Sequence, residues 1–131
     1  MFVEILFFLF SIVLSMTLGL VAGIQRLHAG KKAGPRTYAL VTMAATLFTL
    51  MSTQMGGDDR VAAAVLTGIG FIGAGMIMHK EGDIEGLTTA AGLWLMSAVG
   101  MAVGLGWWWQ GVFVTILALL LLMWNDHGAH N

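Results

Sequence analysis

Two adjacent carboxylates, Asp58 and Asp59, are the side chains in this sequence best suited to hold a cation, and Arg60 follows them directly. A pair of acids can bind Mg²⁺ weakly through oxygen atoms and retained water molecules. The alternative is a solvated turn in which Arg60 neutralises one acid. Either acid would also favour a helix that begins at Val61, because a carboxylate suits the positive end of a helix. The pattern favours the solvated turn.

Two arginines, Arg26 and Arg36, flank a second polar segment, "QRLHAGKKAGPR". The first interpretation is interfacial: both side chains extend to the membrane surface and help to set the topology. The second is functional, with Arg36 at the start of an apolar stretch reaching into a polar cavity.

Thr88 and Thr89 open another apolar stretch, directly after Gly86 and Leu87. The free N–H groups at a helix N-terminus can face an anion or a water-lined cavity. Helix capping and hydrogen bonds between helices are the alternative roles for these two hydroxyls, and that interpretation is favoured.

The histidines do not indicate a metal site. His79 is alone in a charged loop, and His127 and His130 lie three residues apart in a polar tail. The chain has no cysteine, so disulfides and thiolate metal sites are excluded. Because the sequence shows no phosphate loop and no nucleophile–base arrangement, we expect no enzymatic activity and no cofactor, with Mg²⁺ as the one ion to consider.

The composition places these residues in a membrane protein. Hydrophobic residues make up 58% of the 131 residues and charged residues 10%, whereas soluble domains carry about 25% charged residues. So few charges cannot cover a globular surface. The net charge of −1 provides no basic field for nucleic acid, so the lipid bilayer is the expected surroundings.

Five stretches are long and apolar enough to cross a bilayer, which takes about 20 residues. Each lacks Asp, Glu, Lys and Arg, and the connections between them are short. The expected fold is therefore all-α, a polytopic integral membrane bundle in one domain over residues 1–131. The expected spans cover residues 5–24, 38–55, 61–78, 87–106 and 107–124.

The basic residues predict the orientation, because Lys and Arg concentrate in cytoplasmic loops. Five of the six lie in the two loops on one side, and only Arg60 lies on the other. We therefore expect the N-terminus outside and the C-terminus in the cytoplasm. The five are Arg26, Lys31, Lys32, Arg36 and Lys80.

Small residues spaced one helical turn apart predict where helices pack, because association in lipid depends on close backbone approach. Three of the stretches carry such glycines: Gly19 and Gly23 in the first, Gly68, Gly70, Gly73 and Gly75 in the third, and Gly100 and Gly104 in the fourth. We expect these three spans to form the packed centre and their glycine faces to support self-association, with the fifth span facing lipid. A broken third helix, as in some transporters, is the alternative.

These motifs resemble the membrane domain of the MgtC/SapB family. The segments that carry the resemblance are "GIGFIGAG" (68–75), "GLTTAAGLW" (86–94) and "SAVGMAVG" (97–104), supported by "AGPRTYALV" (33–41) and "GIQR" (23–26). The resemblance covers about residues 10 to 105, with the motifs in the family's order and spacing.

Several polar positions depart from the family pattern. The chain has Gln25 for a usual Glu, Ala64 for Gln, Tyr38 for His and Glu85 for Arg. Pro35 replaces a Leu, and the acids before Arg60 are shifted by a residue. A site that relied on the family's Glu or Gln is expected to be altered here.

The resemblance implies a bacterial inner-membrane protein linked to magnesium limitation and to virulence. It favours a regulatory role in membrane energetics through partners such as the ATP synthase. A transporter or channel for Mg²⁺ or another ion is the first alternative, and a structural subunit of a membrane complex the second. Apart from Tyr38 and the tryptophans, the polar side chains of the spans are Ser, Thr and the two glutamines Gln54 and Gln110, and this scarcity favours a regulator over a hydrated pore. Many relatives carry a soluble C-terminal domain, which we do not expect here.

Overall fold

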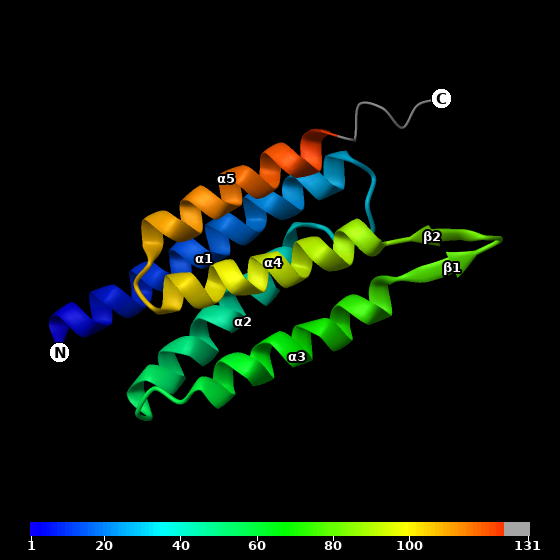
Figure 1. Ribbon diagram of the computed structural model, residues 1–131. Helices are drawn as coiled ribbons and strands as arrows, with labels where there is room; N and C mark the ends of the chain where they lie inside the picture. Colours follow the sequence, from blue (N-terminus) through cyan, green and yellow to red (C-terminus); the bar gives the residue numbers. More distant parts are fainter. Residues whose placement is uncertain (125–131) are drawn as a thin grey trace.

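A computed structural model describes residues 1–124, and each expected span forms an α-helix within a few residues of its expected bounds (Figure 1). A short antiparallel hairpin joins the third helix to the fourth. The elements are α1 (Phe2–His28), α2 (Pro35–Gln54), α3 (Asp59–Met76), β1 (Met78–Lys80), β2 (Asp83–Glu85), α4 (Leu87–Gly104) and α5 (Trp108–Trp124).

Three of these helices, α1, α3 and α4, are long and apolar enough to cross a membrane by length and composition, and α5 is a shorter apolar helix. The remaining helix, α2, carries many hydroxyl side chains. It begins with Pro35 in its first turn, where the missing N–H of proline costs nothing.

The polar segment between the third and fourth spans, expected to be a plain connection, is a β-hairpin. Its two-residue turn places Glu81 at φ 46° and Gly82 at φ 88°, the left-handed pair that matches the twist of the flanking strands. Lys80 Nζ and Glu85 Oε2 lie 3.4 Å apart across the hairpin. The hairpin extends beyond the helices at one end of the molecule (Figure 1).

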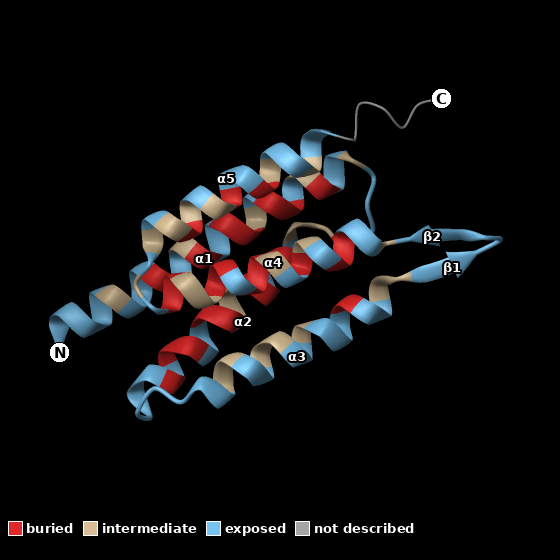
Figure 2. Ribbon diagram, in the orientation of Figure 1, coloured by how far each residue is buried: buried red, intermediate tan, exposed pale blue. Residues whose placement is uncertain are grey.

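The centre of the bundle is α2, which packs against both α1 and α4, and buried residues are frequent along it (Figure 2). The glycines of α1 and α4 make this possible. A β-carbon at Gly19 would lie 2.7 Å from the Cα of Ala39, and one at Gly104 would lie 2.7 Å from the Cβ of Thr49. A β-carbon at Gly23 would likewise collide with the backbone of Pro35, and one at Gly100 would collide with the Thr42 carbonyl. All four therefore lie where backbones meet.

The expectation that the third span belongs to the packed centre is wrong. α3 lies on the outside of the bundle, packs mainly against α4, and has a single buried residue, Gly73. A β-carbon at Gly73 would make ordinary contact with Ala90 on α4. Gly68, Gly70 and Gly75 face open space within the described chain. Glycine spacing indicated a close approach, but α4 meets only one face of α3. No break interrupts α3.

α5 packs along α1 and α4 and leaves its large aliphatic side chains exposed, as its composition predicts. Its small residues Gly111, Thr115 and Ala118 form its buried face. Trp108 fixes its start, since Nε1 donates to Ser11 Oγ at 3.3 Å and the indole contacts Phe7 and Phe10 on α1.

Candidate functional site

A buried polar cluster joins α1, α2 and α4 at the end of the bundle that carries the hairpin. Arg26 in the last turn of α1 is 1% exposed, and its Nη2 donates to Thr89 Oγ1 at 3.4 Å. Tyr38 on α2 is fully buried and donates from its hydroxyl to the Thr89 carbonyl at 3.4 Å. The Tyr38 hydroxyl also interacts with the Arg26 guanidinium. Three helices thus converge on Thr89.

The local sequence places each member of this cluster. Arg26 lies three and seven residues after Gly23 and Gly19, which puts it on the same face of α1, and that face meets α2. Thr89 is in the first turn of α4, which begins after Gly86 at φ 85°. A β-carbon at Gly86 would collide with the Met76 carbonyl, so glycine is required where the hairpin returns to α4.

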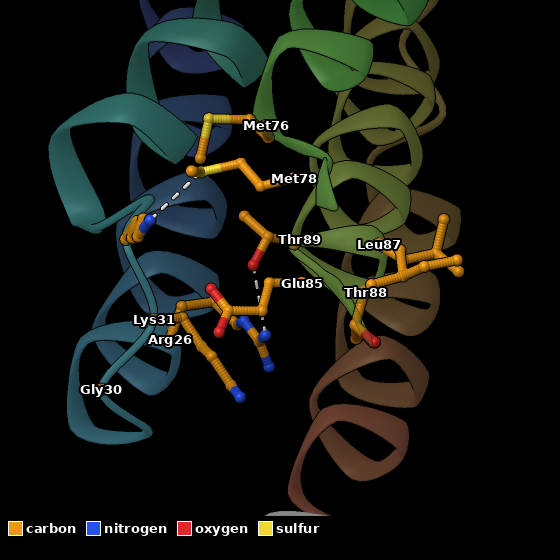
Figure 3. Close-up of a pocket in the computed structure, with 12 residues that line it drawn as sticks. Arg26, Gly30, Lys31, Met76, Met78, Glu85, Leu87, Thr88 and Thr89 are labelled. Carbon is orange, nitrogen blue, oxygen red and sulfur yellow. Dashed lines mark hydrogen bonds between the residues drawn. The ribbon is translucent and has the colours of Figure 1, made fainter. Parts of the chain in front are cut away.

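A cavity of about 410 Å³ opens beside the cluster, between the end of α1, the hairpin and the first turn of α4 (Figure 3). Basic side chains line it from the α1 side and hydroxyls from the α4 side. Lys32 Nζ lies 3.3 Å from Met78 Sδ, which ties the α1–α2 loop to β1. The lining residues are Arg26, Gly30, Lys31, Lys32, Met76, Met78, Ile84, Glu85, Gly86, Leu87, Thr88 and Thr89.

Some of the residues that the sequence predicts as functional line this cavity, and others do not. Arg36 is exposed and is not among the residues that line this cavity, so its functional interpretation stays a prediction. Arg26 is buried there instead, so it is not an interfacial side chain extending to water. Thr89 bonds between helices as the favoured interpretation states, and Thr88 lines the cavity from an exposed position.

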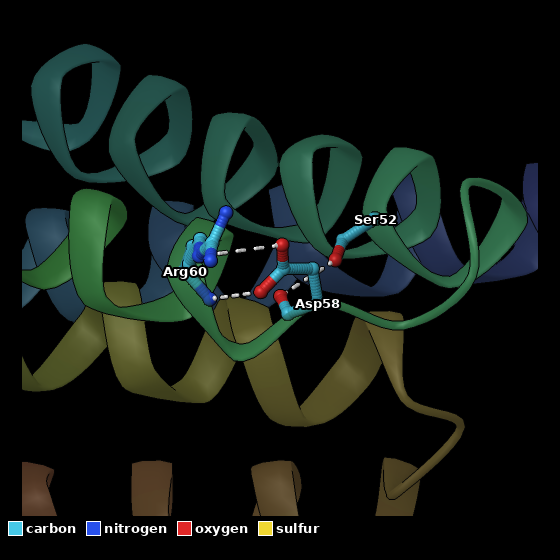
Figure 4. Close-up of polar contacts among 3 residues, drawn as sticks. All are labelled: Ser52, Asp58 and Arg60. Carbon is cyan, nitrogen blue, oxygen red and sulfur yellow. Dashed lines mark hydrogen bonds and ion pairs between the residues drawn. The ribbon is translucent and has the colours of Figure 1, made fainter.

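The acidic turn lies at the opposite end of α3 from the cavity, about 25 Å away along the helix at 1.5 Å per residue. Asp58 is the N-cap of α3, where Oδ1 accepts from the Arg60 N–H at 2.9 Å and Oδ2 lies 3.8 Å from Arg60 Nε. Ser52 donates to the Asp58 carbonyl at 3.2 Å (Figure 4). Asp59, in the first turn of α3, is exposed. The turn is therefore exposed to solvent, and its acid Asp58 caps the start of α3.

Among residues 1–124, no three His, Asp or Glu side chains lie together as metal ligands would. His79 is exposed on β1, and the tail histidines His127 and His130 fall outside the described residues.

Tyr38 is the site residue that sequence reasoning missed. The sequence alone marks it only as a departure from the family pattern. Its position four residues before Thr42 and eight before Thr46 is the available signal, because this spacing puts all three on one helix face. Thr42 Oγ1 donates to the Tyr38 carbonyl at 2.7 Å, which continues the same polar stripe down α2.

Comparison with known proteins gives a consistent result. The model of the MgtC family matches residues 12–128. "Protein SrpB" of Synechococcus elongatus is 36% identical, with 86% of this chain and 71% of that protein covered. "Putative magnesium transporter YhiD" of Escherichia coli strain K12 is 40% identical over 76% of this chain and 52% of its own length.

"Protein MgtC" of Salmonella typhimurium is 38% identical, with 86% of this chain and 49% of that protein covered. The chain thus spans about half the length of the YhiD and MgtC proteins. No solved structure matches the chain.

Proposed function

This chain belongs to the MgtC family of membrane proteins, and we propose that it is a regulatory inner-membrane protein linked to magnesium limitation. It acts through contacts with other membrane proteins, of which the ATP synthase is the first candidate. Its N-terminus lies outside and its C-terminus in the cytoplasm.

The observation that carries this proposal is the outer face of α3. This helix is long and apolar enough to span a membrane, yet Gly68, Gly70 and Gly75 have no atom of the described chain near their missing side chains. Glycine in a membrane helix allows another helix to approach closely. Gly68 and Gly75, seven residues apart, share one face of α3, and that face therefore suits a helix of another chain.

A shallow apolar cavity beside this face adds to the argument. It has a volume of about 490 Å³ and lies between α2 and α3, lined mainly by small and aliphatic residues such as Ala44, Ala64 and Gly68, with Phe48 and Arg60 also in the lining. Side chains of a docked helix would fill it. Because small-residue faces also support pairing of like helices, the same surface is the proposed site of self-association.

The interior of the bundle supports a regulator over a hydrated pore. The buried hydroxyls of Thr42, Thr49 and Thr115 donate to carbonyls four residues earlier in their own helices, at 2.7–2.8 Å. Groups engaged in this way do not offer a row of ligands to a passing ion. Arg26, the one buried charged side chain among residues 1–124, lies at the end of the bundle rather than along it.

Transport is the alternative, and the name of the YhiD relative refers to it. Two measurements distinguish regulation from transport: Mg²⁺ flux in liposomes and crosslinking to partner proteins in cells. Purified protein in liposomes is expected to give no Mg²⁺ flux above protein-free vesicles. A flux that is lost on Asp58→Asn and Asp59→Asn substitution would contradict regulation and establish transport.

The contact test uses a photo-crosslinking residue at Gly68, with the same residue at Leu120 on the exposed face of α5 as the matched control. In cells starved of magnesium, we expect crosslinks to an ATP synthase subunit from position 68 and not from position 120. Equal crosslinking from both positions, or none from position 68, would contradict the proposed contact face.

A further inference from the structure

We propose that the cavity at the hairpin end of the bundle binds the phosphate of an anionic phospholipid headgroup. The cavity is the 410 Å³ space that Arg26, Lys31 and Lys32 share with the first turn of α4. The cavity lies at the end of the bundle, and its lining contains none of the three open glycines of α3, Gly68, Gly70 and Gly75.

The charge of the lining favours an anion. Among the described residues that line the cavity, three carry basic side chains and one, Glu85, carries a carboxylate. That carboxylate already lies 3.4 Å from Lys80 Nζ in the hairpin, so much of its charge is balanced from outside the cavity. The net positive charge is therefore set by Arg26, Lys31 and Lys32.

Arg26 gives the cavity a fixed element. Its guanidinium is held by Thr89 and is almost fully buried, so little side-chain freedom remains to be lost when a ligand binds. A guanidinium is planar and matches the oxygen atoms of a phosphate geometrically. Lys31 and Lys32, both exposed, add mobile point charges at the rim.

The first turn of α4 contributes in the same direction. Its first intrahelical bond runs from the Ala90 N–H to the Gly86 carbonyl, which leaves the N–H groups of the preceding turn outside the helical ladder. These groups carry the partial positive charge of the helix end. Thr88 and Thr89 bring hydroxyls to the same wall.

The position and the apolar lining select a lipid over a free phosphate. The cavity lies where α1 and α3 end and α4 begins, which is the depth of the headgroup layer for helices of membrane-spanning length. Met76, Met78 and Leu87 line the cavity next to the basic side chains. A glycerol and acyl chain would contact these apolar groups, and basic pockets at helix ends are suited to anionic lipid.

The test measures lipid retention by native mass spectrometry of the protein in detergent with added phosphatidylglycerol or phosphatidylcholine. We expect preferential binding of phosphatidylglycerol. Lys31→Gln and Lys32→Gln should each weaken it about fivefold, the effect of one basic residue at an anionic surface. Glu85→Gln should strengthen it, since it removes the one carboxylate found among the described lining residues.

Arg36→Gln is the matched control, because it removes the same charge at the same end of the bundle from an exposed side chain outside the cavity. It should leave binding unchanged. Equal weakening by this variant, or equal retention of the two lipids, would overturn the proposal. Displacement of phosphatidylglycerol by millimolar inorganic phosphate would overturn the lipid source and assign the cavity to a soluble phosphate compound.

Discussion

The hydroxyl of Thr46 on α2 lies 2.7 Å from the carbonyl oxygen of Gly100 on α4, so a side chain bonds directly to the backbone of a neighbouring helix. The same hydroxyl lies 3.1 Å from the Thr42 carbonyl in its own helix. This approach depends on glycine, because a β-carbon at position 100 would collide with the Thr42 carbonyl. The α2–α4 contact is therefore set jointly by hydroxyls and missing side chains.

Gly100→Ala should destabilise the protein by about 1–3 kcal/mol, because the added methyl group must separate two packed backbones. The measurement is thermal unfolding in detergent. Gly68→Ala is the control, since the same methyl group enters open space on α3. Its unfolding temperature should equal or exceed that of the parent. A reversal of this order would contradict the central position of α2.

Thr46→Val keeps the shape of the side chain and removes the hydroxyl that reaches Gly100. We expect a loss of about 0.6 kcal/mol, the average for a polar contact between membrane helices. Thr17→Val is the comparison, since Thr17 is exposed and its hydroxyl bonds only within α1, to the Val13 carbonyl at 2.8 Å. Reversible unfolding in mixed micelles should show a loss for the first variant and a smaller one for the second.

Single cysteines at Lys31 and Gly57 should react with a membrane-impermeant thiol reagent from opposite sides of the membrane, since they lie beyond opposite ends of α2. The chain has no cysteine of its own, so any labelling of the protein comes from the introduced cysteine. We expect Gly57→Cys to be labelled in intact cells and Lys31→Cys only after lysis, because basic residues concentrate in cytoplasmic loops. Labelling in the reverse pattern would invert the topology.

Self-association through α3 predicts that Gly68→Cys forms a disulfide-linked dimer in native membranes on mild oxidation. Leu120→Cys on α5 tests whether crowding alone produces dimers, because that position is also exposed. Dimer formation is read from non-reducing gels. If Leu120→Cys dimerises as readily as Gly68→Cys, the glycine face of α3 is not the contact.

The sequence predicted the helices well because their signals are local. An apolar run of membrane length, Pro35 at the start of α2 and Asp58 at the start of α3 depend only on neighbouring residues. Glycine spacing could not identify the partner of each face, since a close approach has the same pattern whichever helix makes it. From its four glycines we therefore expected α3 to lie in the centre. The centre is instead α2, which Gly19 of α1 and Gly104 of α4 both contact.

The site was harder to predict than the fold. By sequence, Arg26 belongs to the polar segment that follows the first span. Its burial can be predicted only if the face of α1 that carries Gly19 and Gly23 is known to pack against α2. The partner Thr89 is 63 residues away, a distance over which no local pattern operates. The hairpin turn at Glu81 and Gly82 had a usable signal, a glycine at its second position.

The central position of α2 also bears on how the chain enters the bilayer. A 20-residue helix with three buried threonines is a poor substrate for insertion by itself, and α2 is absent from the helices that qualify by hydropathy. α1 precedes it and presents Gly19 and Gly23 to the surface that α2 will occupy. α1 covers only the part of this surface around Thr42, whereas Thr46 and Thr49 contact Gly100 and Gly104 of α4. We therefore expect stable insertion of the threonine-rich helix to be completed only when α4, which is made later, has entered the bilayer.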